Sequence, residues 1–165
     1  MSEQPTIPRC AGCGWSWSLP IDEALDVVAD VPARVGTALD RAGVAALRSP
    51  ADGVWSPSSY AWHLVDVLRI GTERLWTIAL DPVSGLPSWD QDDLAAVRRY
   101  ADLSSIAVLR ALRDAAATWL GTAGSVPLDA SAEHDEEGPM TAADVIRRCA
   151  HEAQHHLLDI ERALR

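Results

Sequence analysis

The sequence predicts an all-α protein, an antiparallel four-helix bundle. Amphipathic segments of about 20 residues alternate with polar stretches rich in proline and glycine, and no strand-type alternation competes with them. A chain of 165 residues with 48% hydrophobic residues can bury one core without disulfide bonds. We therefore expect residues 21–165 to form the bundle, and residues 1–20 to form a segment that carries a C-x2-C pair and packs on it.

The first two helices are predicted over residues 21–42 and from Pro57 to about Leu80. The first segment repeats apolar residues at spacings of three and four, as Leu25, Val28, Ala29, Val35 and Leu39 show. A connection rich in Ser, Pro, Asp and Gly follows at residues 47–54. Ser56 then supplies an N-cap and Pro57 a first-turn proline, which opens the most apolar segment of the chain.

The third helix is predicted over residues 92–120, with a break near Asp102 and Ser104. It follows a connection, residues 81–90, that contains two prolines and a glycine, and it ends at Gly121. We expect residues 122–139 to form a long surface loop over one mouth of the domain, because this stretch is polar and includes an acidic run. His134 lies in this run and is expected to be solvated.

The last helix is predicted from Thr141 to Leu164. Thr141 and Asp144 have the spacing of a capping box, in which each side chain bonds to the backbone of the other residue. Together with the three preceding segments, this helix completes a bundle whose core can hold ligands from facing helices. Function is therefore expected between the helices.

Composition and charge limit which partners and which cellular compartment we expect for this protein. A formal net charge of −10 and a pI near 4.8 disfavour nucleic-acid and membrane partners, because phosphate backbones and anionic lipids repel an acidic protein. No apolar run reaches the roughly 20 residues that span a bilayer, and no export signal precedes the first helix, so we expect a cytoplasmic protein. All 14 basic residues are arginine, which is typical of coding DNA rich in G and C, as in actinobacteria.

Three of the five histidines lie between residues 151 and 156, in the last helix. His151, Glu152 and His155 match the spacing of a zinc protease motif, in which the glutamate is the general base. That interpretation is rejected, because such enzymes need a third protein ligand, commonly downstream, and only ten residues follow His155.

Helix phase divides the polar residues of this segment into two pairs. With Ala153 set to zero and about 100° per residue, Glu152 and His156 fall at roughly −100° and −60°, on one shoulder of the apolar stripe. His151 and His155 fall near 160° and −160°, on the far face. Each pair is spaced four apart, so its side chains lie on adjacent turns and can reach one ion.

The inner pair needs a third ligand from another helix. His63 is the only other histidine within a predicted helix, and its phase also places it on a shoulder of the apolar stripe. A site of His63, Glu152 and His156 would suit a divalent ion such as zinc and would leave coordination positions open to water or substrate. The alternative is that His63 is a satisfied core histidine and that Glu152 and His156 are half-exposed helix residues.

A second metal site is expected from Cys10 and Cys13, a C-x2-C pair with a glycine on each side of its second cysteine. Together with His151 and His155 on the outer face of the last helix, the pair would complete a structural Cys2His2 centre. Such a centre would pin the N-terminal segment across this helix. A redox dithiol and an inert pair are the alternatives, while Cys149 is expected in the core.

Two motifs carry a resemblance to a known family. The segment Trp55-Ser-Pro-Ser-Ser-Tyr-Ala-Trp-His63-Leu-Val-Asp66 resembles the second helix of the DinB-like superfamily, where a tryptophan-serine start precedes a metal-binding histidine. Glu152-x3-His156-x2-Asp159 is similar to the mycothiol-dependent maleylpyruvate isomerase variant of that superfamily. The resemblance implies a four-helix bundle and a divalent metal on His63, Glu152 and His156.

The resemblance also implies a reaction class. We expect a metal-dependent thiol S-transferase or isomerase that uses a low-molecular-weight thiol such as mycothiol on a small electrophile. The alternative is a non-catalytic module that binds a metal or a small ligand. Zinc is the ion we expect, with nickel and iron as alternatives. The isomerases carry an additional C-terminal domain that is not part of these 165 residues, so their particular substrate is not assigned.

Three charged residues are candidate substrate contacts, namely Asp66, Arg74 and Asp159. Solvated or ion-paired groups are the alternative at such positions. If the thiol chemistry holds, the metal would keep the thiol of the cofactor as a thiolate, which would be the nucleophile. A homodimer formed through an outer helix face is a further expectation.

Overall fold

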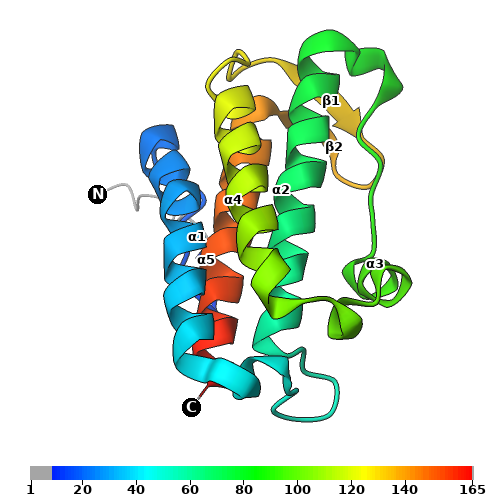
Figure 1. Ribbon diagram of the computed structural model, residues 1–165. Helices are drawn as coiled ribbons and strands as arrows, with labels where there is room; N and C mark the ends of the chain where they lie inside the picture. The colour runs from blue at the N-terminus through cyan, green and yellow to red at the C-terminus, as the bar shows by residue number, and fades with distance from the viewer. Residues whose placement is uncertain (1–8, 165) are drawn as a thin grey trace.

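Four long helices form a bundle in the computed structural model, which describes residues 9–164 (Figure 1). They are α1 (Ile21–Ala42), α2 (Pro57–Leu80), α4 (Ser105–Ala123) and α5 (Ala142–Ala163). Short 3-10 turns follow α1 at Gly43–Leu47 and α2 at Pro82–Ser84. The all-α four-helix bundle expected from the sequence is confirmed.

The helices are arranged so that α1 and α2 lie diagonally across the bundle. Each of these two packs against both α4 and α5, whereas α1 and α2 contact each other at few positions. Figure 1 shows that α2 and α4 run in the same direction, because the segment between them returns along the outside of the bundle. The packed pairs α2 with α5 and α1 with α4 run antiparallel.

Capping residues in the sequence set the first residues of α2 and α5. Ser56 accepts a hydrogen bond from the backbone N–H of Ser59 at 3.1 Å, with Pro57 in the first turn of α2. Thr141 and Asp144 form a complete capping box at the start of α5. These ends agree with the predicted ones because the signals lie within a few residues of each other in the sequence.

The predicted break in the third helix separates two helices. The short helix α3 (Gln91–Arg98) ends at Arg99, which takes the left-handed conformation at a φ of 55°. A 3-10 turn at Tyr100–Asp102 follows, and Ser104 caps α4 by accepting hydrogen bonds from two backbone N–H groups. As a result α3 lies beside the bundle near the start of α2, and α4 alone is a bundle helix (Figure 1).

A β-hairpin occupies the stretch that was expected to be a polar loop. Strand β1 (Ser131–His134) pairs with β2 (Gly138–Thr141) in antiparallel register and covers one end of the bundle. Ala132, His134 and Met140 face inward and are buried. The expectation that His134 is solvated is therefore wrong, because the hairpin turns its ring toward the bundle.

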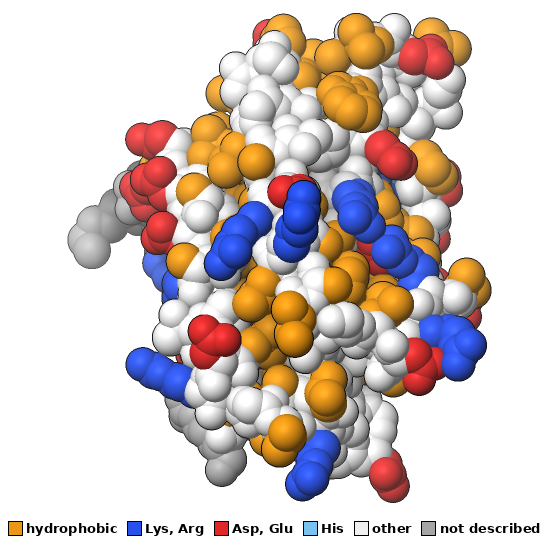
Figure 2. Space-filling model, viewed as in Figure 1, with side chains coloured by type: hydrophobic (Ala, Val, Ile, Leu, Met, Phe, Trp, Pro, Cys, Tyr) orange, Lys and Arg blue, Asp and Glu red, His pale blue; other side chains and the backbone are white. Residues whose placement is uncertain are grey.

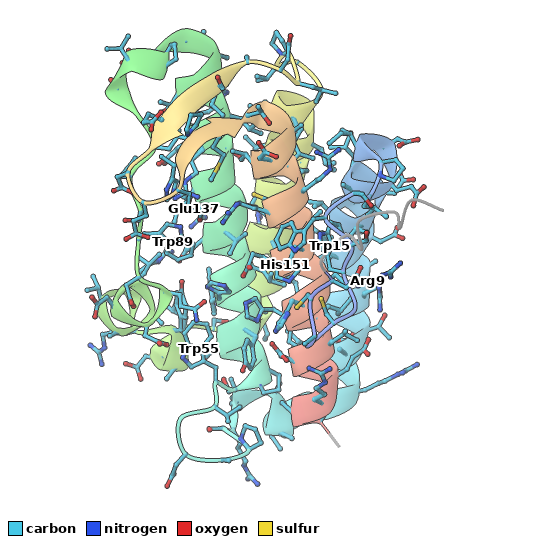
Figure 3. All side chains as sticks on the ribbon, turned by 180° about the vertical axis from the view of Figure 1, so that it is seen from behind. Arg9, Trp15, Trp55, Trp89, Glu137 and His151 are labelled. Carbon is cyan, nitrogen blue, oxygen red and sulfur yellow. The ribbon has the colours of Figure 1, made fainter. Side chains whose placement is uncertain are left out.

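The N-terminal segment, described from residue 9 onward, lies along α5 (Figure 3). Trp15 is 2% exposed and belongs to the main hydrophobic core. The segment is tied to the helix by hydrogen bonds from Arg147 to the carbonyl of Leu19 and from Gln154 to the carbonyl of Cys13. The fully buried side chains at the centre of the core include Leu64, Leu68, Trp119, Ile146 and Leu157.

The outer surface over α1, α4 and α2 carries a mixture of side chains. Figure 2 shows arginine side chains in a band across the middle of this face, with hydrophobic and acidic groups above and below it. Within residues 9–164, no helix is both long enough and apolar enough to cross a membrane.

Candidate metal centre

His63 lies in the centre of the bundle with no hydrogen-bond partner. It extends from α2, it is 1% exposed, and neither ring nitrogen makes a hydrogen bond within the described residues, since the nearest carboxylate oxygen, of Glu152, lies 3.7 Å from Nε2. Buried polar atoms are nearly always hydrogen-bonded, so an unpartnered imidazole of this kind requires an explanation. The alternative drawn from the sequence, a core histidine whose ring is fully hydrogen-bonded, does not describe this residue.

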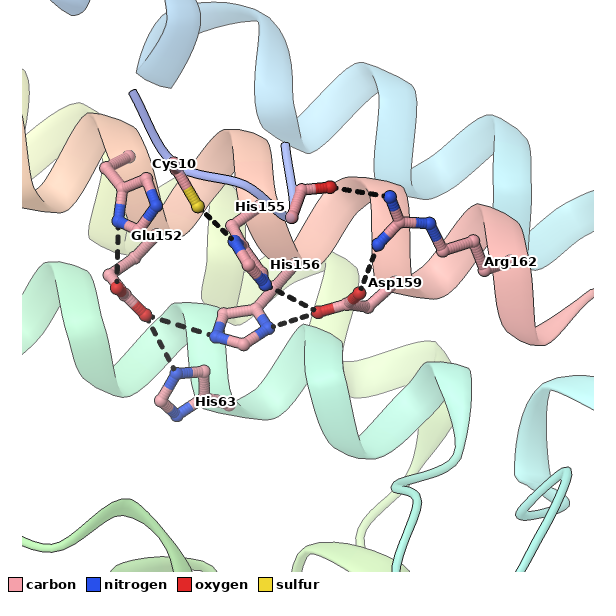
Figure 4. Close-up of polar contacts among 9 residues, drawn as sticks. Cys10, His63, Glu152, His155, His156, Asp159 and Arg162 are labelled. Atoms are coloured by element: carbon pink, nitrogen blue, oxygen red, sulfur yellow. Dashed lines mark hydrogen bonds and ion pairs between the residues drawn. The ribbon is translucent and has the colours of Figure 1, made fainter. Parts of the chain in front are cut away.

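Glu152 and His156 from α5 face this imidazole. Oε2 of Glu152 lies 3.1 Å from Nε2 of His156 and 3.7 Å from Nε2 of His63. The rings of His63 and His156 meet edge to face, with centroids 4.6 Å apart. One ligand atom from each of the three residues lies within 4.8 Å of the others (Figure 4). The structure thus brings together the three residues that helix phase and the resemblance selected.

The second ring nitrogen of His156 is held by Asp159. Nδ1 of His156 lies 3.0 Å from Oδ2 of Asp159, and Arg162 donates to the other oxygen of this carboxylate at 3.1 Å. A carboxylate on one ring nitrogen fixes the tautomer and leaves the other nitrogen free to bind a metal. Asp159, a candidate substrate contact, therefore lies behind the candidate ligand and orients it.

The electrostatics favour a neutral histidine beside an ionised carboxylate. Burial lowers the pKa of His63, which keeps the ring unprotonated as a metal ligand must be. Burial also works to raise the pKa of Glu152, but its contacts with His151, His156 and His63 outweigh that effect and hold the pKa below its usual value. Two neutral imidazoles and one carboxylate are a donor set that fits a divalent ion.

A cleft of about 340 Å³ opens beside the centre. His63 and Glu152 form part of its wall, and Trp17 and Trp89 flank it from the N-terminal segment and the stretch before α3. Figure 3 shows Trp89 beside α2, on the stretch of chain that leads into α3. The cleft is large enough for a small molecule, and it reaches the candidate ligands directly.

Arg74 and Arg148 line the same cleft. Arg74 donates a hydrogen bond to the carbonyl of Pro87 at 2.8 Å, and burial lowers the pKa of its guanidinium group. Its Nε is buried without a partner. Arg148 forms an ion pair with Glu137 from the hairpin. Arg74 was expected to contact substrate, whereas Arg148, Trp17 and Trp89 carry no signal in the sequence, because only the tertiary fold brings these elements together.

Asp66 takes a different place from the one expected of a substrate contact. It is 2% exposed and forms an ion pair with Arg98, and it accepts a hydrogen bond from the hydroxyl of Tyr100 at 2.6 Å. This contact raises the pKa of Tyr100 further, in addition to the effect of burial. Asp66 does not line the cleft, and its contacts favour a structural role that fastens the segment after α3 to α2.

A second cluster lies on the other side of α5. One ligand atom from each of Cys10, Cys13, His151 and His155 lies within 4.8 Å of the others. The structure thus also brings together the four residues of the expected Cys2His2 centre. The third cysteine, Cys149, is buried as expected.

Comparison with known proteins agrees with the fold and with the first resemblance. The chain matches the family model of the DinB superfamily over residues 30–160. It therefore belongs to the DinB superfamily. Among solved structures it is similar to YfiT from Bacillus subtilis, described as a probable metal-dependent hydrolase with an unusual four-helix bundle topology. The TM-score is 0.76 at 16% identity, over 87% of this chain and 85% of that one. No curated protein gives a significant sequence match.

Proposed function

We propose that this protein is a divalent-metal-dependent enzyme that uses a low-molecular-weight thiol of the mycothiol type. It would either transfer the thiol to a small electrophile or isomerise the electrophile with the help of the thiol. The observation that carries the proposal is the buried His63, whose unpartnered ring faces Glu152 and His156 beside a cleft. A bundle that buries an imidazole without a hydrogen bond loses stability unless a ligand satisfies it.

The three residues would hold the ion, with zinc favoured and nickel or iron as alternatives. When bound, a divalent ion lowers the pKa of a coordinated thiol or water and so supplies a nucleophile at neutral pH. Asp159 holds His156 in the required tautomer, and burial keeps His63 neutral. The chain supplies three protein ligands, which leaves room for a substrate in the coordination shell.

The nucleophile must come from outside the chain. Cys149 is the only cysteine among the residues that line the cleft, and burial raises the pKa of its thiol to about 12. A thiol with this pKa stays protonated at neutral pH and is a poor nucleophile. This supports an exogenous nucleophile, either the thiol of the proposed transfer or water.

The arginines of the cleft indicate the class of electrophile. Arg74 and Arg148 line the cleft, in a protein whose formal net charge is −10. A guanidinium in a cleft binds carboxylates with good geometry. We therefore infer that the electrophile carries a carboxylate or a similar anionic group, which the arginines orient toward the candidate metal centre.

Hydrolysis is the second candidate function. It is favoured by the likeness to YfiT, which is described as a probable metal-dependent hydrolase. The same residues would then position water in place of a thiol. The two reactions differ in whether a thiol is consumed along with the electrophile.

The test measures both reactions with metal-loaded protein and a panel of anionic electrophiles and esters. We expect thiol consumption to depend on the metal, and to fall by at least about 100-fold in Glu152→Gln. Glu161→Gln is the matched control, because Glu161 lies on the same helix but, among residues 9–164, pairs with Arg34 at the surface and is not part of the candidate metal centre. Ester cleavage without thiol consumption would establish hydrolysis, and metal binding without either reaction would leave a binding module.

A further inference from the structure

The loop around Cys10 and Cys13 has the form of a metal-binding turn. The N–H of Gly14 donates to the carbonyl of Cys10 at 2.7 Å, and the N–H of Cys10 donates to the carbonyl of Trp15 at 2.9 Å. Gly14 closes the turn at a φ of 75°, which favours glycine. Both thiols are therefore directed to one side of a tight turn, the arrangement in which a C-x2-C pair binds a metal.

This turn sits directly on the outer histidines of α5. A Cβ atom on Gly12 would come within 2.8 Å of Cε1 of His155, so the missing side chain lets the backbone approach the ring. Arg162 donates to the carbonyl of Gly12 at 2.7 Å. Trp15 is buried beneath the loop and Trp17 stacks at an angle on His151, with centroids 4.9 Å apart. The loop is thus held in place before any ion binds.

Each outer histidine has one nitrogen toward the cysteines and the other on a carboxylate. Nδ1 of His155 lies 3.5 Å from Sγ of Cys10, and its Nε2 lies 3.5 Å from Oδ2 of Asp159. Nδ1 of His151 lies 3.2 Å from Oε1 of Glu152, whereas its Nε2 is buried with no partner. Metal-bound histidines commonly show this pattern, with a carboxylate behind each ring.

The donor set fits zinc. Bond lengths of about 2.3 Å to sulfur and 2.0 Å to nitrogen place the four donors of a tetrahedron about 3.3 to 3.8 Å apart. The four candidate atoms already lie within 4.8 Å of one another.

We propose that Cys10, Cys13, His151 and His155 form a second metal site, a structural Cys2His2 zinc centre that fixes the N-terminal segment to α5. Four protein ligands close the coordination shell, so the role is structural rather than catalytic. The site is distinct from the inner one, because the two groups share no ligand and its cysteines come from the N-terminal segment, whereas His63 comes from α2. Figure 4 shows Cys10 beside His155 and, apart from them, His63 facing Glu152 and His156.

The two centres share their supporting carboxylates. Glu152 places one oxygen by His151 and the other by His156, and Oδ2 of Asp159 contacts both His155 and His156. The outer ion would therefore help to hold Glu152, which is itself an inner ligand, and Asp159, which orients His156. This consequence rests on the proposed inner centre, and it predicts weaker metal binding there when the outer ligands are removed.

Metal content per chain tests the proposal. Wild type loaded with zinc and freed of excess ion is expected to hold about two ions per chain, and the double variant Cys10→Ala/Cys13→Ala about one. Cys149→Ala is the matched control and should keep both, because its thiol lies in the core away from the cluster. His156→Ala should lose the inner ion and keep the outer one.

Cobalt substitution provides a spectroscopic test that wild type alone can answer. A thiolate bound to cobalt gives a sulfur-to-metal charge-transfer band in the near ultraviolet, which the nitrogen and oxygen donors of the inner site cannot give. We expect the band in wild type and in His156→Ala, and its loss in the double cysteine variant. If the double cysteine variant lost one ion and His156→Ala kept the metal content of wild type, the outer site would be supported and the inner site contradicted.

Two results would overturn the proposal. The first is a cobalt-loaded wild type without the charge-transfer band, together with a zinc content that the cysteine substitutions do not change. The second is a protein, purified under reducing conditions, whose intact mass shows a Cys10–Cys13 disulfide in place of bound metal. That result would assign the pair to redox chemistry instead.

Discussion

Replacing His63 with leucine separates metal ligation from packing. His63 is 1% exposed, and both ring nitrogens lack a hydrogen-bond partner. An unsatisfied buried polar group costs about 1–3 kcal/mol, and an apolar replacement removes that cost. We therefore expect metal-free His63→Leu to be as stable as wild type or more stable, by up to about 2 kcal/mol.

With metal bound, wild type should be more stable than His63→Leu. When the free metal concentration is 100 times the dissociation constant, binding stabilises the folded state by about 2.7 kcal/mol. His63→Leu cannot gain this stabilisation at the inner site. Urea unfolding near pH 8, with and without a chelator, measures both states. Because burial lowers the pKa of His63, the ring is neutral at that pH, and protonation does not enter the comparison.

His134→Leu is the matched control. His134 is also buried, at 5% exposure, but its Nδ1 accepts a hydrogen bond from the N–H of Glu136 at 3.3 Å. Its Nε2 lies 3.2 Å from a guanidinium nitrogen of Arg74. Removing a satisfied histidine deprives both donors of this partner, so we expect a loss of about 1–3 kcal/mol with or without metal. If metal-free His63→Leu lost as much stability as His134→Leu, His63 would be a satisfied core residue and the reasoning would be refuted.

Three further predictions follow from single contacts. Glu152→Gln should weaken inner metal binding by more than about 10-fold in a chelator competition, and an unchanged affinity would remove Glu152 from the ligand set. Gly71→Ala should destabilise the fold by about 1–3 kcal/mol in urea unfolding, because its Cβ would overlap Sγ of Cys149 and lie 2.9 Å from Nε1 of Trp119; a neutral result would show that the core can relax there. Tyr100→Phe should cost about 1–3 kcal/mol through the lost bond to Asp66 without changing metal content, and a lost ion would contradict a purely structural role.

Local chemistry made the helices predictable from the sequence. Ser56, Pro57 and the capping box at Thr141 act within one turn, so their effect can be read without knowing the fold. The hairpin could not be recognised, because each strand has four residues and its buried positions, such as Ala132, are set by the end of the bundle beneath it.

The candidate ligands were predictable for a similar reason. Spacings of four on one helix and the phase of each residue separate Glu152 and His156 from the outer histidines, and the structure keeps that division. The surroundings of the ligands depend on tertiary contacts. Asp66 lies three residues from His63, yet its role is decided by Arg98, which arrives from a helix outside the bundle.

The central claim is that His63, Glu152 and His156 bind one divalent ion. Anomalous diffraction at the zinc absorption edge from crystals of zinc-loaded protein tests it directly. The account predicts a peak between these three side chains, about 2.0–2.1 Å from Nε2 of His63. A zinc-loaded crystal with no peak within bonding distance of His63 would contradict the claim.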